Sequence, residues 1–363
     1  MQFIDLKTQQ LRIRDDLEQR LGTLLDHGQY ILGPEVTEME ETLATYVGVK
    51  HCVSAASGTD ALLLALLALE TGPGDEVITT PFSFIATAEV IGLVGATPVF
   101  VDIDPVTYNI DPTAIVAAIT ERTRAILPVG LFGLCADMDT ISEIAADHNL
   151  PVIEDAAQSF GARYKGRRSC GLSTIGCTSF FPAKPLGCYG DGGACFTNDE
   201  ALASRLRELR NHGQDRPYHH PRLGINGRMD GMQAAVILSK MAIFDEEVEA
   251  RARIGARYST LLADADCVTP YIPADYDSVY AQYTLQVKDR EHVRQTLREA
   301  SIPTAVYYPI TLDQQPALRA IGRSVGNLEV THALAEQVVS LPMHPYLDEE
   351  TQDRIVDVLR EAL

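Results

Sequence analysis

The sequence has few positive charges for its length of 363 residues: 30 lysines and arginines face 50 aspartates and glutamates, and the net charge is −20. A general attraction to nucleic acid or to anionic membranes is therefore not expected. An anionic ligand would have to be held at a local positive site. We accordingly predict no nucleic-acid partner and no membrane partner.

Signals for disulfides, zinc, secretion and membrane insertion are also missing. The seven cysteines are odd in number and contain no C-x-x-C pair, which favours reduced thiols in a cytoplasmic protein. The first five residues show no basic segment followed by an apolar one, so no signal peptide is expected. The longest apolar run, residues 61–69, is far shorter than the ~20 residues of a membrane span.

Apolar strands alternate with helices between residues 72 and 155, which predicts a mainly parallel sheet with helices on both faces. The length and the 46% hydrophobic content allow two domains. We predict an α/β fold with a large domain at 1–245, including an N-terminal arm, and a smaller α+β domain at 246–363. The smaller domain is expected to contain strands at 280–287 and 304–308 and a closing helix at 349–362.

One lysine, Lys184, lies between an apolar strand-like run and a glycine-rich turn. Its neighbours Phe180, Phe181 and Pro185 would disfavour the ammonium form and lower the pKa of the amine. A neutral amine attacks carbonyl groups, so Lys184 is a candidate Schiff-base lysine for pyridoxal 5'-phosphate. The alternative is a loop lysine that extends into water.

A short strand at 52–55 leads through small residues into a helix, an arrangement that binds phosphate at the free N–H groups of the helix N-terminus. Gly58 and Thr59 occupy that turn, and Ser179 would add a hydroxyl. The sequence has no Walker lysine and no G-x-G-x-x-G, so a triphosphate or dinucleotide site is not supported. The alternative is ordinary helix capping by Ser57 or Thr59.

Two strand ends carry residues suited to an aromatic cofactor ring. Asp155 ends the strand 151–154, where its carboxylate would need a partner such as a protonated pyridine nitrogen. Gln158 could reach the ring hydroxyl, and Phe84 could stack on the ring. The alternatives are a helix cap for Asp155 and core packing for Phe84. These residues together predict a pyridoxal phosphate site, with no metal.

Three motifs carry a family resemblance: EDAAQS at 154–159, SFFPAKPLG at 179–187 and NGRMDGMQAA at 226–235. The chain resembles the DegT/DnrJ/EryC1/StrS nucleotide-sugar aminotransferases over essentially its whole length. The resemblance implies a pyridoxal-phosphate-dependent transferase of fold type I, like aspartate aminotransferase, and a homodimer with shared active sites. Lys184 favours aminotransfer, because the sugar dehydratases of this family have a histidine at that position.

Further segments, at 28–34, 212–215, 280–283 and 341–346, most resemble the UDP-2-acetamido-2-deoxy-3-oxo-glucuronate aminotransferases of lipopolysaccharide O-antigen biosynthesis. The resemblance implies a 3-keto UDP-sugar as acceptor and glutamate as amino donor. The alternatives are an aminotransferase for another keto sugar, 4-keto or 6-deoxy and UDP- or dTDP-linked, or a pyridoxal phosphate sugar dehydratase. A cofactor-binding regulator is not supported, because no helix-turn-helix signal is present.

The resemblance also assigns residues outside the cofactor set. It places Asn226 at the cofactor phosphate of a neighbouring subunit. Two departures from the close relatives, Ala183 in place of serine and Tyr307 in place of histidine, touch the sugar pocket. The positions that match contacts to the sugar nucleotide are Gly28, Tyr30, Arg228 and Tyr308, with Tyr307 beside them.

Overall fold

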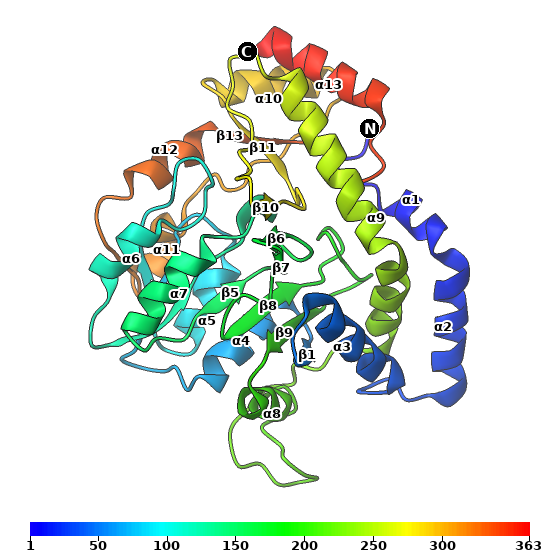
Figure 1. Cartoon of the computed structure of the whole chain (residues 1–363), viewed down its shortest axis with the longest axis vertical. Helices are drawn as coiled ribbons and strands as arrows, with labels where there is room; N and C mark the ends of the chain where they lie inside the picture. Colours follow the sequence, from blue (N-terminus) through cyan, green and yellow to red (C-terminus); the bar gives the residue numbers. More distant parts are fainter.

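The computed structural model describes residues 1–363 and has a mixed sheet at its centre (Figure 1). Hydrogen-bonded ladders form two halves of four strands, and bridges from Ile126 to Val152 and from Val129 to Asp155 join the halves. From edge to edge the strands are β1 (His51–Ala55), β9 (Gly193–Thr197), β8 (Ile175–Ser179), β5 (Ile153–Asp155), β4 (Thr123–Leu127), β2 (Glu76–Thr79), β3 (Thr97–Phe100) and β12 (Arg323–Ser324). Strand β9 runs antiparallel to both of its neighbours, β1 and β8, and the other neighbouring strands are parallel to each other. This confirms the mainly parallel sheet.

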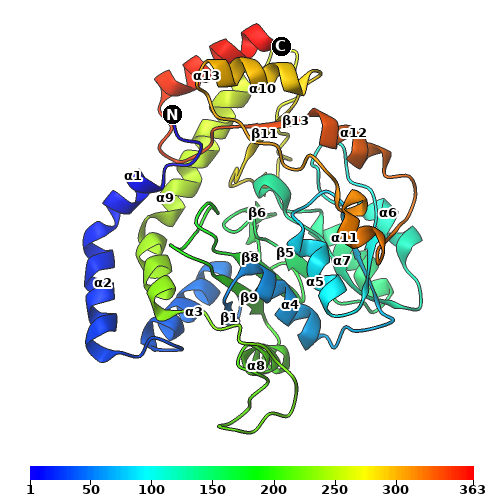
Figure 2. The ribbon, with the colours of Figure 1, turned by 180° about the vertical axis from the view of Figure 1, so that it is seen from behind.

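Helices cover both faces of this sheet, because successive side chains of a strand point to opposite sides. Val77 of β2 packs in a core with α4 (Gly58–Ala68), α5 (Ala86–Leu93) and α8 (Glu200–Leu209). The next residue, Ile78, packs in the opposite core with α6 (Pro112–Ala118) and α7 (Met138–Asp147). Figures 1 and 2, which view the molecule from opposite sides, show these two helix layers in turn.

The long helix α9 (Gly231–Leu261) connects the sheet region to the C-terminal part of the chain (Figure 1). The helices α1 (Leu6–Arg12), α2 (Arg14–His27) and α3 (Pro34–Val47) lie along the same side of the molecule. Residues 245 and 246, at the predicted domain boundary, lie within α9. The two regions are thus joined by a continuous helix, and the C-terminal strand β12 belongs to the central sheet. The division into two domains stays a prediction.

The C-terminal region contains a two-stranded antiparallel sheet of β11 (Tyr283–Gln286) and β13 (Val338–Leu341). The expected strand at 304–308 is wrong: this segment makes a single bridge, from Ala305 to Ser340 at the outer edge of β13, because the chain leaves that edge after Ala305. The helices here are α10 (Arg290–Glu299), α11 (Pro316–Arg319), α12 (Glu329–Gln337) and α13 (Glu349–Ala362). The closing helix has the predicted bounds.

Small elements complete the chain between these layers. They are β6 (Arg163–Tyr164), β7 (Arg167–Arg168), β10 (Tyr276–Asp277) and two short 3-10 helices, η1 (Leu131–Gly133) and η2 (Leu312–Gln314). None of the helices combines the length and the apolar composition needed to cross a membrane.

Candidate active site

A cavity of about 640 Å³ lies where the carboxyl ends of β2, β5 and β8 meet the N-terminus of α4. Parallel strands place their carboxyl ends at one edge of the sheet, so residues distant in sequence converge there. The cavity is lined by most of the predicted site residues: Gly58, Thr59, Phe84, Asp155, Gln158, Ser179, Ala183, Lys184, Tyr307 and Tyr308.

Lys184 is carried on a closed loop that follows β8. The loop is joined at its base by the Cys188 N–H, which donates to the Phe180 carbonyl at 2.7 Å. Glycine is required at position 187, since a Cβ there would lie 2.5 Å from the Phe181 carbonyl oxygen. Burial lowers the pKa of the Lys184 amine, and the charge of Asp155 opposes that effect. The shift increases the fraction of neutral, nucleophilic amine.

Asp155 is a buried carboxylate, 4% exposed, at the end of β5. Its Oδ2 accepts a hydrogen bond from the Thr87 hydroxyl at 2.8 Å, and its Oδ1 accepts one from the Ala157 N–H at 3.1 Å. Burial raises the pKa of Asp155, while the two hydrogen bonds and the charge of Lys184 favour the carboxylate. The capping alternative is met only in part, because Asp155 accepts from the Ala157 N–H but a turn and not a helix follows. A protonated ring nitrogen would fit as its cationic partner.

The N-terminus of α4 has the geometry of an anion site. The Ser57 hydroxyl caps the helix by accepting from the Asp60 N–H at 3.0 Å, as the capping alternative expected. The N–H groups of Gly58 and Thr59 remain without a partner in the chain. A Cβ on Gly58 would lie 2.5 Å from the Ser179 Cβ, so the Ser179 hydroxyl lies against this first turn. Two free N–H groups and a hydroxyl therefore surround a space suited to a phosphate.

Two further side chains suit the ring of a cofactor. Gln158 is held in place because its Nε2 donates to the Tyr308 hydroxyl at 3.0 Å and its Oε1 accepts from the Phe132 N–H at 2.9 Å. Burial raises the pKa of Tyr308, which keeps its hydroxyl protonated. Phe84 is 55% exposed at the cavity wall, which contradicts the core-packing alternative and leaves a ring face free for stacking.

Four predicted residues do not line this cavity: Gly28, Tyr30, Asn226 and Arg228. They lie near the start of α9, where the Tyr30 carbonyl accepts from the Gly231 N–H at 2.8 Å and Ile31 bridges Asp230. Tyr30 is 45% exposed. Arg228 donates to the Asn211 side chain at 2.8 Å, and its Nε is buried without a partner.

The sequence reasoning missed several residues of the cavity wall: Phe3, Ile4, Ser83, Thr87, Asp191 and Gln282. Thr87 is the most consequential, because it orients Asp155 from 68 residues away. No sequence pattern signals this contact, which depends on how α5 packs over the sheet.

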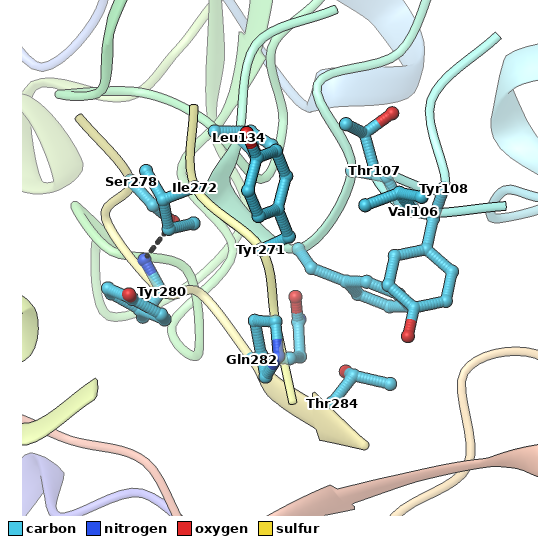
Figure 3. A pocket seen from close by; sticks show the side chains of 13 residues that line it. Val106, Thr107, Tyr108, Leu134, Tyr271, Ile272, Ser278, Tyr280, Gln282 and Thr284 are labelled. Atoms are coloured by element: carbon cyan, nitrogen blue, oxygen red, sulfur yellow. Dashed lines mark hydrogen bonds between the residues drawn. The ribbon is translucent and has the colours of Figure 1, made fainter. Parts of the chain in front are cut away.

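Gln282 also borders a second pocket, shown in Figure 3 with Tyr271, Ile272 and Tyr280 on its wall. This pocket measures about 20 Å³, which is room for about one water molecule. In it the Ser278 hydroxyl accepts from the Tyr280 N–H at 3.0 Å. The large cavity is therefore the candidate active site.

Comparisons with known proteins agree with this geometry. Residues 11–360 match the DegT/DnrJ/EryC1/StrS aminotransferase family. A UDP-2-acetamido-2-deoxy-3-oxo-D-glucuronate aminotransferase from Pseudomonas aeruginosa is 57% identical over 348 residues, covering 96% of each chain. A crystal structure of a DegT DnrJ EryC1 StrS aminotransferase from Brucella abortus superposes with a TM-score of 0.97 at 45% identity, covering 99% of each chain. NtdA from Bacillus subtilis, with bound cofactor PMP, has a TM-score of 0.90 at 33% identity, covering 99% of this chain and 83% of its own.

Proposed function

Because this chain belongs to the DegT/DnrJ/EryC1/StrS aminotransferase family, we propose that it converts UDP-2-acetamido-2-deoxy-3-oxo-glucuronate to the 3-amino sugar with glutamate as donor. It is a pyridoxal-phosphate-dependent sugar aminotransferase of fold type I. The observation that carries the choice of sugar is the 57% identity to an enzyme named for that substrate. Ala183 and Tyr307, the two departures from close relatives, both line the cavity.

The residues of the cavity fit pyridoxal 5'-phosphate. Gly58, Thr59 and Ser179 would hold the phosphate, Asp155 the ring nitrogen, and Phe84 the ring face. Gln158, the remaining assigned side chain, would contact the ring hydroxyl. The bound cofactor supplies an electron sink for the carbon that loses or gains a proton.

Lys184 would act as the acid and base of both half-reactions. Its amine, kept partly neutral by burial, removes the proton from the α-carbon of glutamate. In the second half-reaction it delivers a proton to C3 of the sugar, which fixes the configuration of the new amine. Tyr308 and Gln158 form a hydrogen-bonded part of the cavity wall.

We also propose a homodimer with shared active sites. The four residues outside the cavity, Gly28, Tyr30, Asn226 and Arg228, would serve the site of the partner subunit, with Asn226 at its phosphate and the others at the sugar nucleotide. Exposed apolar side chains adjoin them and support a contact surface: Ile31 is 49% exposed and Met232 is 45% exposed.

Subunit mixing tests the shared site. Lys184→Ala and Arg228→Ala chains are each expected to be poorly active, whereas random re-association of equal amounts should restore roughly one quarter of the wild-type rate. Half of the dimers would then be mixed, and each mixed dimer would have one intact site. The rate is measured after mild dissociation and refolding, with each variant mixed with itself as control. A site built within one chain predicts no recovery.

A substrate panel tests the reaction itself. We expect glutamate-dependent amination of the 3-oxo-glucuronate UDP-sugar to exceed that of 4-keto and 6-deoxy UDP- or dTDP-sugars in kcat/KM by at least about 10²-fold. A site that binds the carboxylate and the 3-keto group through polar contacts would have those contacts unpaired with the other sugars. Amination is followed by 2-oxoglutarate release. Preference for another sugar would overturn the assignment, and keto product without glutamate consumption would indicate a dehydratase.

The pathway and the location follow from the same proposal. We propose a cytoplasmic enzyme that supplies an amino sugar for O-antigen or another surface polysaccharide. The seven cysteines support a reducing compartment, since all are free thiols in the structure and only Cys267 is not fully buried.

A further inference from the structure

A second lysine, Lys240 on α9, is buried beneath the loop that carries Lys184. It is 1% exposed, and its amine makes no direct ion pair with a carboxylate, although the charge of the buried Glu247, two turns further along α9, favours the ammonium form. Burial lowers the pKa of its amine to about 8. A buried amine without an ion pair reduces the stability of a fold, and an apolar side chain of similar size would avoid that loss. The buried amine is therefore better explained by a role other than stabilising the fold.

Lys240 contacts the end of the loop that carries Lys184. Its Nζ donates to the Gly187 carbonyl at 2.5 Å and lies 4.3 Å from the centre of the Tyr189 ring. Two turns earlier on α9, Gln233 accepts a hydrogen bond from the Tyr189 N–H at 2.9 Å. One face of α9 thus forms hydrogen bonds to Gly187 and to Tyr189, at the end of the loop.

Gly187 packs against the start of the same loop, so its position affects the rest of the loop. A Cβ at Gly187 would lie 2.5 Å from the Phe181 carbonyl oxygen and 2.6 Å from that of Pro182, so its backbone packs directly against the start of the loop. The Lys184 N–H in turn donates to the Phe181 carbonyl at 2.9 Å. Movement of Gly187 would therefore shift the backbone from which the Lys184 side chain extends.

We propose that Lys240 is a positioning residue that holds Gly187 and thereby sets the direction of the Lys184 amine in the cavity. The inference rests on the proposed function in one respect, that Lys184 is the reacting lysine. The hold on the loop is a separate property that can be measured in the cofactor-free protein.

The test compares Lys240→Met with Phe244→Leu, a change of a buried side chain one turn further along α9, whose ring packs against Tyr46 and Phe160. Lys240→Met should lower kcat roughly 10- to 100-fold with little change in the KM for glutamate, because misplacement by about 1 Å affects the chemical step most. Phe244→Leu should keep kcat within about twofold, and Lys240→Arg, which retains a donor, should recover part of the loss.

Amide hydrogen exchange supplies a readout independent of activity. In the cofactor-free protein, the N–H groups of Lys184 and Cys188 should exchange at least about tenfold faster in Lys240→Met than in Phe244→Leu. If Lys240→Met does not fold, Lys240→Gln takes its place in both measurements, because glutamine is polar but too short to reach Gly187. Unchanged exchange and kcat would overturn this inference and leave the aminotransferase assignment intact. Full activity of Lys184→Ala would overturn the assignment of Lys184 and with it the catalytic part of this inference, whereas the hold of Lys240 on the loop would still be decided by the exchange rates.

Discussion

Replacement of Lys184 by alanine should reduce aminotransfer by roughly 10⁴-fold or more, because the chain would lose both the nucleophile and the proton carrier of the site. No other lysine lines the cavity to substitute for it. The measurement pairs steady-state kinetics with borohydride reduction of the cofactor-loaded protein. In the wild type, the cofactor mass should be found on the peptide that contains Lys184.

The control for this experiment is Lys288→Ala, since the Lys288 side chain is 81% exposed and pairs with Asp266 on the surface. That variant should keep the wild-type rate and the labelled Lys184 peptide. Cofactor mass on the buried Lys240 would contradict the assignment. So would a protein that stays colourless when pyridoxal phosphate is added.

Asp155→Asn should lower kcat by about 10²- to 10³-fold, the range found when one well-placed electrostatic partner is removed from an active site. Asparagine keeps the size of the side chain and one oxygen, which can accept from the Ala157 N–H, while its NH2 group can donate to the Thr87 hydroxyl oxygen in place of the bond that Thr87 donates to Asp155. It lacks the charge that would hold a proton on the ring nitrogen of the cofactor. Kinetics and the absorbance spectrum of the loaded enzyme measure the effect, with Asp102→Asn, outside the cavity, as the matched control.

Asp155→Asn should not lower the stability of the cofactor-free protein, although it lowers kcat. Burial raises the pKa of Asp155 above 3.8, its ordinary value, so the folded state disfavours the carboxylate. The contribution of this group to the free energy of unfolding is full below the unfolded pKa and is lost as pH rises through the folded pKa. At pH 7, Asp155→Asn should therefore melt at the same or a higher temperature than the wild type. A lower melting temperature would show that the carboxylate is stabilising without its partner.

The strand ends explain why much of the site was predictable. Asp155 and Ser179 each end a parallel strand, and Gly58 begins the helix that follows β1. Such positions converge at one edge of any sheet of this class. The predicted strands and helices were therefore enough to expect that these residues lie close together. The expected strand at 304–308 did not form although its apolar residues were apparent: after Ala305 the chain leaves the edge of β13, and Val306, Tyr307 and Tyr308 line the cavity instead.

The sequence by itself determined the α/β class, because this class follows from local periodicity. The cofactor followed from residue types at strand ends together with the family resemblance, and Lys184 stays the predicted reacting lysine. Only the tertiary structure decided what orients those residues. Thr87 reaches Asp155 across 68 positions, and Lys240 reaches Gly187 across 53. Contacts of this kind depend on how helices pack on the sheet, and helix packing is the sum of many weak apolar contacts that no short stretch of sequence encodes.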